Sequence, residues 1–272
     1  MKNHKIAGGG GTQLHLVETG NPSGRAIMFI HGVSQCWLTW SRQMSSDLAD
    51  EHRLVAMDLR GHGLSDKPRE GYMESKLWAD DVNAAIQALR LDNPILCGWS
   101  YGALVILDYI RHYGEGDISG INLIGGVTKL GSEEAASVLT PEFISLLPGF
   151  FSTEVEESVR SLGSLLRLCF AGEPSAEELY EMLGYNLSVP PYVRQAMFSR
   201  SFDNDDLLPR IRKPVLITHG AKDAVVKLTA VDEHKAGLAH AQIQIVASAG
   251  HGPFWDDPAA FNQNLRGFSE AL

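Results

Sequence analysis

PILCGWSYGALVILDYIRHY, residues 94–113, is the most informative stretch of this 272-residue chain. An apolar segment typical of a buried strand leads into Gly98-Trp99-Ser100-Tyr101-Gly102, and a helical pattern follows to Tyr113. A serine on such a sharp strand-to-helix turn has strained backbone angles. Its flanking glycines are needed because side chains there would collide with the neighbouring strand and helix. The pattern predicts an exposed Ser100 hydroxyl supported by Gly98 and Gly102.

Short apolar runs alternate with longer amphipathic segments on both sides of this motif, a pattern that predicts an α/β fold with a mostly parallel sheet and helices on both faces. The predicted strands are Leu14 to Glu18, Ala26 to Ile30, Arg53 to Asp58, Pro94 to Trp99, Ile118 to Ile124, Pro214 to Thr218 and Gln242 to Val246. The predicted helices are Glu74 to Leu91, Tyr101 to Tyr113, Val225 to Ala239 and Pro258 to Leu272.

Residues 128–204 interrupt the alternation, because they contain helical patterns divided by Pro and Gly and no convincing strand. We therefore expect an α/β core formed by residues 1–127 and 205–272, with residues 128–204 inserted on top of it as a helical unit. The glycines at 8–11 predict a hairpin tip or a flexible start.

The composition indicates a globular protein, since 44% of residues are hydrophobic and 21% are charged. A net charge of -10 without any basic block makes nucleic acid and anionic membranes poor candidate partners. The cysteines Cys36, Cys97 and Cys169 are far apart, which favours neither disulfides nor a thiolate zinc site. The N-terminus lacks the apolar stretch of a signal peptide, and no run is long enough to span a membrane. We expect a soluble, cytoplasmic protein.

A serine hydroxyl is a weak nucleophile near neutral pH, so it needs a base, and the base needs an orienting acid. Among the ten histidines, His251 lies in a glycine-flanked loop between the last predicted strand and the last helix. Asp223 follows the strand that ends at Thr218, whereas the segment after Ile124 offers no carboxylate. Both candidates are expected at the carboxyl edge of the sheet, beside Ser100. His251 could otherwise be an ordinary solvent-exposed loop residue, and Asp223 could otherwise cap the helix that follows it.

An oxyanion requires two backbone donors, and the residue after the nucleophile, Tyr101, supplies one of them. The loop after the strand Ala26 to Ile30 is the expected source of the second. Gly32 permits a tight turn that directs the Val33 N–H toward the serine, and His31 is expected to hold this loop by hydrogen bonds.

The order Ser, Asp, His, the turn at 98–102, the loop His31-Gly32 and the segment Asp58-Leu59-Arg60-Gly61-His62-Gly63-Leu64-Ser65 together resemble the α/β-hydrolase superfamily over nearly the whole chain. The resemblance implies that residues 128–204 are a helical cap and that Asp58 and His62 fix a structural loop. Asp58 and His62 could otherwise pair on a metal, but no third ligand is evident, so we expect neither a metal nor a cofactor.

Dehalogenases and epoxide hydrolases of this superfamily use an aspartate at the turn, and Ser100 argues against both. The resemblance thus implies a serine esterase or lactonase that forms an acyl-enzyme. Alternatives are a cofactor-free haloperoxidase or perhydrolase, a carbon-carbon bond hydrolase, and a ligand receptor with little turnover. Carbon-carbon hydrolases commonly have a tryptophan where this chain has Gly252.

The substrate is expected to be a small, largely apolar molecule, because the cap segment is rich in apolar side chains and no Lys or Arg cluster is present. Packing of the cap onto the core explains most of these side chains equally well. The candidate pocket residues are Trp37, Trp99, Phe143, Leu147 and Phe151. Both a monomer and a homodimer are compatible with the sequence.

Overall fold

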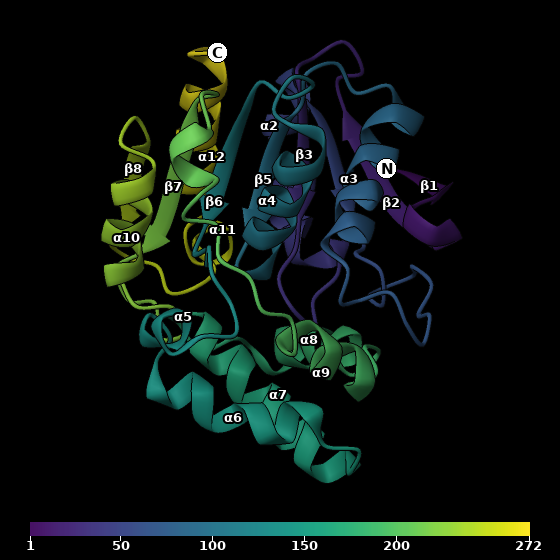
Figure 1. The fold of residues 1–272 in the computed structure, drawn as a ribbon, viewed down its shortest axis with the longest axis vertical. Coiled ribbons are helices and arrows are strands. Elements are labelled where there is room, and N and C mark those ends of the chain that lie inside the picture. The colour runs from purple at the N-terminus through teal and green to yellow at the C-terminus, as the bar shows by residue number, and fades with distance from the viewer.

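The computed structural model describes residues 1–272. Its centre is an eight-stranded sheet in the order β1-β2-β4-β3-β5-β6-β7-β8 (Figure 1). The pairs β1/β2 and β2/β4 are antiparallel, and the other neighbouring strands are parallel. The strands are β1 (Lys2–Ala7), β2 (Gln13–Gly20), β3 (Ala26–Ile30), β4 (Arg53–Met57), β5 (Ile95–Trp99), β6 (Gly120–Ile124), β7 (Val215–Gly220) and β8 (Gln242–Val246).

The predicted α/β sheet is confirmed, and every predicted strand agrees with an observed one to within two residues at each end. Strand β1 was not predicted from the sequence. It is an edge strand whose side chains alternate between exposed and half-buried, so it lacks the apolar run of the central strands. The glycines at 8–11 form a turn in the β1–β2 hairpin, where Gly10 and Gly11 have positive φ angles.

Two helical layers cover the sheet (Figure 1). Helices α3 (Ser75–Leu89) and α4 (Tyr101–Tyr113) pack together on one face. The other layer consists of α1 (Ser41–Met44), α2 (Leu48–Glu51), α11 (Pro253–Asp256) and α12 (Pro258–Glu270). Helix α10 (Thr229–Gly237) and the short turns η1 (Gly9–Gly11), η2 (Trp37–Trp40) and η3 (Leu208–Arg210) complete this part of the chain.

Helix α10 begins four residues later than the predicted Val225, and this prediction was wrong for a local reason. The N–H groups of Val225 and Val226 both donate to the Asp223 carboxylate, and Val226 pairs with Leu139 in an isolated bridge. The segment is therefore held in an extended loop although its composition suits a helix.

The chain between β6 and β7 is helical and lies beyond the carboxyl edge of the sheet (Figure 1). It contains α5 (Glu133–Ser137), α6 (Pro141–Phe151), α7 (Val155–Cys169), α8 (Ala176–Leu187) and α9 (Pro191–Phe198). Its two ends are joined by an antiparallel bridge between Leu130 and Phe202. Buried Arg194 donates to the carbonyls of Phe150 and Val189 and to the Ser158 hydroxyl, which ties the helices of this insert together.

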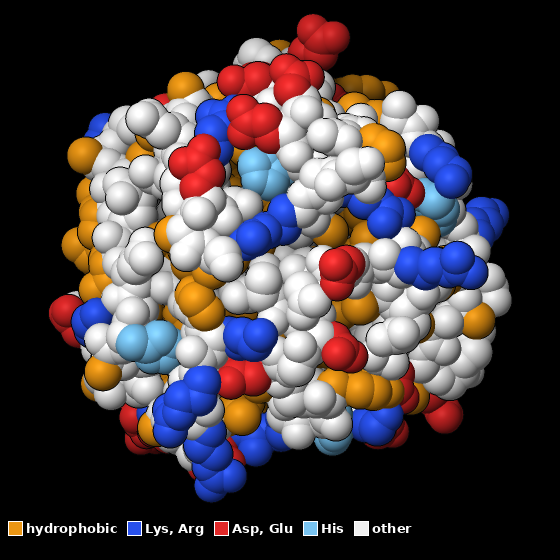
Figure 2. Space-filling model, turned by 90° about the horizontal axis from the view of Figure 1, so that it is seen from above, with side chains coloured by type: hydrophobic (Ala, Val, Ile, Leu, Met, Phe, Trp, Pro, Cys, Tyr) orange, Lys and Arg blue, Asp and Glu red, His pale blue; other side chains and the backbone are white.

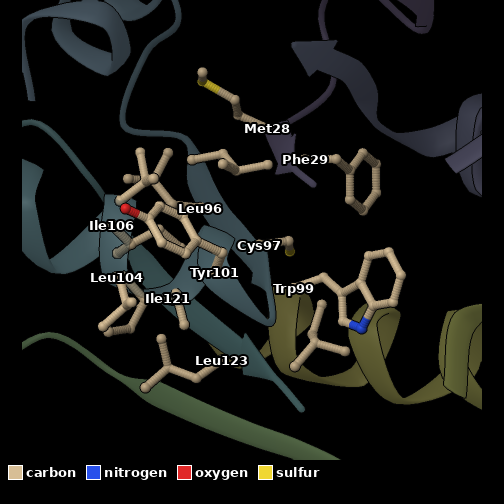
Figure 3. Close-up of a cluster of buried hydrophobic side chains, with 14 of the residues drawn as sticks. Met28, Phe29, Leu96, Cys97, Trp99, Tyr101, Leu104, Ile106, Ile121 and Leu123 are labelled. Carbon is tan, nitrogen blue, oxygen red and sulfur yellow. The ribbon is translucent and has the colours of Figure 1, made fainter. Parts of the chain in front are cut away.

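The hydrophobic core comprises 66 buried residues. Figure 3 shows the part beside the Ser100 turn, where Met28 and Phe29 of β3, Leu96 and Cys97 of β5, and side chains of α4 pack together. Since β5 and α4 are almost entirely buried, the turn between them is held from both sides.

The end of the molecule opposite the insert carries Lys and Arg side chains among Asp, Glu and apolar ones, without a field of one sign (Figure 2). None of the helices combines the length and the apolar character that crossing a bilayer requires.

Candidate active site

Ser100 lies at the junction of β5 and α4 with φ 53° and ψ −115°, a conformation that is rare for a residue with a side chain. Its N–H donates to the Ile124 carbonyl, and its carbonyl accepts from the Ala103 N–H. A Cβ atom on Gly98 would lie 2.5 Å from the Gly102 carbonyl oxygen, and one on Gly102 would lie 2.3 Å from that of Ile30. The helix and the strands therefore approach closely enough to force the turn, which leaves Ser100 partly exposed.

His251 and Asp223 meet at the same edge of the sheet. The His251 Nδ1 atom lies 2.8 Å from Asp223 Oδ2, and both side chains are buried. The other carboxylate oxygen, Oδ1, accepts the N–H groups of Val225 and Val226, each at 2.8 Å. With the carboxylate held in this way, Nδ1 of His251 carries the proton and Nε2 is left as the basic nitrogen.

The surroundings of His251 fix the position of its loop. Trp99 donates from its indole Nε1 to the His251 carbonyl at 2.8 Å, and the two rings lie 5.3 Å apart. A Cβ on Gly125 would lie 3.0 Å from His251 Nδ1, so the chain after β6 passes directly beside the imidazole. These contacts connect the His251 loop to β5, which leads into Ser100, and to the end of β6.

Asp223 is charged in this setting. Burial by itself raises the pKa of this carboxyl, but the opposing influence of His251, His219 and the Val226 N–H keeps it below its usual value. His219 Nε2 lies 3.3 Å from Asp223 Oδ2 and donates to the Val226 carbonyl at 3.0 Å. Burial lowers the pKa of His219, so its imidazole is neutral and holds the loop that carries Asp223.

The two candidate oxyanion donors line the same cavity as Ser100. The Val33 N–H donates to no acceptor in the chain, and Tyr101 is the first residue of α4, where N–H groups have no intrahelical partner. A Cβ on Gly32 would lie 3.2 Å from the Ser100 Cβ, which shows how near this loop comes to the serine. His31 accepts from the Leu59 N–H at 3.0 Å and donates to the Gly32 carbonyl at 2.7 Å.

Asp58 and His62 make hydrogen bonds within the loops that flank the site. Asp58 accepts from the N–H groups of Trp37 and Leu64 and from His15 Nδ1. His62 accepts from the Ser34 N–H and donates to the Arg60 carbonyl. Burial lowers the pKa of His62 well below its usual range, so its ring is neutral. Their polar atoms are thus committed to loop structure.

The space beside Ser100 has two parts that share several lining residues. An apolar cavity of about 190 Å³ is lined by Ser100, the loop after β6 and the insert, and a narrow recess of about 20 Å³ reaches His251. The cavity wall comprises Val33, Ser100, Tyr101, Val127, Lys129, Leu130, Gly131, Ser132, Ala135, Ala136, Leu139, Phe143, Leu147, Phe198, Val225 and Val226. The recess is lined by Gly32, Val33, Gln35, Trp99, Ser100, Phe143, Leu165, Cys169, Val225 and His251.

Three of the candidate pocket residues, Trp99, Phe143 and Leu147, contribute to these walls, whereas Trp37 and Phe151 do not. Trp37 begins η2 and packs against the core from the side, and Phe151 ends α6 and packs on Phe198 with ring centroids 5.7 Å apart. These two residues lie outside the walls of both spaces beside Ser100, because aromatic character alone does not determine which side of a loop or helix faces a cavity.

Several residues of the site were missed from the sequence. Val225 and Val226 could have been suspected, because they directly follow Asp223. Lys129, Gln35 and Cys169 carried no local signal. Lys129 lines the cavity with its stem while its ammonium group pairs with Glu134 and Asp205, at 2.6 and 2.7 Å. Only the closure of the insert onto the core brings these groups together.

The arrangement of sheet, turn and carboxyl-edge loops is that of a known enzyme class. Residues 27–264 match the model of the alpha/beta hydrolase family, and the chain belongs to this family. The esterase RhEst1 from Rhodococcus sp. ECU1013 is 36% identical and superposes with a TM-score of 0.94 over 100% of both chains. The esterase EaEST from Exiguobacterium antarcticum is 25% identical, with a TM-score of 0.85 over 99% of this chain and 100% of that one. A non-heme chloroperoxidase from Streptomyces lividans is 26% identical, covering 95% of this chain and 96% of its own. The protein is an esterase-like α/β hydrolase.

Proposed function

We propose that the chain is a serine hydrolase that cleaves a carboxylic ester or lactone of a small, largely apolar substrate. The observation that carries this proposal is that His251, which is hydrogen-bonded to Asp223, lines the same recess as Ser100. The similarity to solved esterases supports the same reaction class. The insert, residues 128–204, would act as the cap that supplies much of the apolar wall.

The reaction follows from these positions. Ser100 Oγ attacks the carbonyl carbon as its proton passes to His251 Nε2, and Asp223 stabilises the imidazolium. The N–H groups of Val33 and Tyr101 hold the oxyanion, assisted by the N-terminus of α4. Collapse expels the alkoxide, which takes the proton from His251. Water then attacks the acyl-enzyme with His251 again as base, and the acid leaves as Ser100 is restored.

The cavity limits the group that fits beside Ser100. Its volume of about 190 Å³ is only somewhat larger than that of a cavity that holds a benzene molecule. The ammonium group of Lys129 is neutralised by two carboxylates, so the wall offers no free cation for a phosphorylated substrate. These features favour a short or compact apolar acyl group.

The first test is sustained hydrolysis of a p-nitrophenyl ester series from acetate to decanoate, with nitrophenol release and intact mass followed together. We expect turnover in the wild type and a loss on the order of a million-fold in kcat for Ser100→Ala. Ser45→Ala, an exposed serine remote from the cavity, is the matched control and should retain full activity. A Ser100→Ala loss of only tenfold would refute the assignment. A single burst that leaves a stable adduct would instead favour a receptor.

A perhydrolase is the second candidate, because the chloroperoxidase relative covers nearly the whole chain. In that reaction, hydrogen peroxide replaces water in the second half and yields a peroxyacid. Peroxyacid formation from acetate and hydrogen peroxide that exceeds ester hydrolysis in rate would favour this alternative over the esterase.

A further inference from the structure

A buried arginine of the insert contacts the helix that begins at the nucleophile. Arg200 follows α9, its side chain is 1% exposed, and it takes no part in the proposed chemistry. Its Nη1 donates to the Tyr101 hydroxyl at 2.9 Å, and its Nη2 donates to Asp108 Oδ2 at 2.6 Å. The guanidinium thus joins residues 199–204, the return segment of the insert, to α4.

The two partners lie on one face of α4, because positions seven apart are two helical turns apart. Tyr101 is the residue whose N–H is the proposed oxyanion donor, and its side chain is buried beside Leu96, Leu104 and Ile106 (Figure 3). The Tyr101 hydroxyl in turn donates to the Met197 carbonyl at 3.4 Å. The first turn of α4 is therefore joined by hydrogen bonds to the end of α9 and to Arg200.

Aromatic rings enclose the rest of the guanidinium. Its central carbon lies 4.5 Å from the Phe202 ring centroid and 5.4 Å from that of Trp78 on α3. Asp108 is its only carboxylate partner, and its Nε atom is buried without a hydrogen-bond partner. A buried charge that depends on one carboxylate and one hydroxyl tolerates little displacement of either partner.

The same segment forms part of the cavity wall. Phe202 exchanges two backbone hydrogen bonds with Leu130, at 2.9 and 3.0 Å, and Leu130 and Phe198 both line the cavity. Asn204 donates from its side chain to the Thr128 carbonyl, so the two ends of the insert are also joined there. Any shift of the return segment therefore moves the wall relative to the start of α4.

We propose that Arg200 is a positioning residue that holds the cavity wall in register with Ser100 and the Tyr101 N–H. This proposal rests on the proposed hydrolase function. Lysine cannot replace it, because one ammonium group cannot reproduce the fork that reaches Tyr101 and Asp108 in two directions.

The decisive comparison is Arg200→Lys against Arg194→Lys. Arg194 is also a buried arginine of the insert, but it binds Ser158 and backbone carbonyls of the insert and makes no hydrogen bond to α4. Both variants are expected to lower the melting temperature. We expect Arg200→Lys to lower kcat per titrated active site by about 10- to 100-fold, and Arg194→Lys by less than about threefold. Equal kinetic losses at equal loss of stability would overturn the proposal.

Two further measurements keep the outcome clear. If Arg200 acts through Tyr101 and Asp108, then Tyr101→Phe and Asp108→Asn should also lower kcat. Their effects should not be additive with that of Arg200→Lys. Amide spectra provide a readout independent of turnover: the Ser100, Tyr101 and Leu130 amide signals should shift in Arg200→Lys and not in Arg194→Lys. If the wild type hydrolyses no ester, the proposed function fails, and unshifted Arg200→Lys amides would separately refute the positioning role.

Discussion

Ser100 is held in a backbone conformation that its own side chain does not favour. Its positive φ angle persists because buried strand β5 and buried helix α4 determine the path of the chain on either side. The hydroxyl therefore needs no induced movement to reach the cavity. In the proposed mechanism, reactivity depends on the hydrogen bond between His251 and Asp223, because Asp223 would set the orientation and tautomer of the imidazole.

Asp223→Asn should lower kcat by about a thousand- to ten-thousandfold without unfolding the loop that carries this residue. The asparagine carbonyl can still accept the N–H groups of Val225 and Val226, so the loop remains supported. The amide does not accept the His251 Nδ1 proton when its NH2 group faces the ring, which favours the wrong tautomer. Steady-state ester kinetics and the melting temperature, measured on one preparation, separate the two effects. An unchanged kcat would show that Asp223 is not the acid.

At the scale of elements, the turn depends on how closely α4 approaches β3. Gly102 is in α4, and a methyl group there would meet the Ile30 carbonyl oxygen at 2.3 Å, a backbone atom that cannot rotate away. The insert also contacts the core through backbone atoms, because the segment before α6 pairs with the loop that carries Asp223. The insert and the loop that carries Asp223 are consequently parts of one packed assembly.

Gly102→Ala is expected to destabilise the fold by about 1–3 kcal/mol or more, because α4 must move away from β3. Gly267→Ala on α12 is the matched control, since a Cβ there meets nothing within 4 Å. Alanine in that helix should stabilise by about 0.5–1 kcal/mol. Urea unfolding of both variants provides the measurement. The steric explanation fails if Gly102→Ala is as stable as the wild type.

For the whole molecule, buried neutral histidines make stability depend on pH. His234 on α10 is 3% exposed, and burial lowers its pKa to about 4. Burial likewise lowers the pKa of His31 and His62. As the pH falls below about 6.5, the unfolded chain takes up protons at these sites while the folded chain does not, so stability is lost with acid.

Between pH 6.5 and 4, His234 alone should therefore reduce the free energy of unfolding by roughly 3 kcal/mol. His234→Gln removes this titration, so its free energy of unfolding should fall less steeply over the same window. Urea denaturation at several pH values from 7 to 4.5 gives both slopes. The comparison relies on the slope, because the substitution also changes stability at neutral pH. Parallel slopes in the two proteins would contradict this account.

The local sequence was sufficient to predict the central strands and the turn at Ser100. Buried parallel strands require continuous apolar runs, and the turn requires glycines where backbones approach within van der Waals distance, so both leave signals within a few residues. The residues His251 and Asp223 could be selected because the carboxyl ends of parallel strands share one edge. Edge strand β1 left no such signal, because its side chains are exposed or at most half-buried.

Tertiary structure alone decided which side chains surround the site. Arg200 and Asp108 are 92 residues apart in the chain, and neither residue type at those positions suggests the other. Lys129 and Asp205 meet only because the two ends of the insert close together, and packing against other residues leaves Trp37 and Phe151 outside the cavity. The physical reason is that periodicity records which face of an element is apolar, whereas the partner of that face depends on the packing of the entire chain.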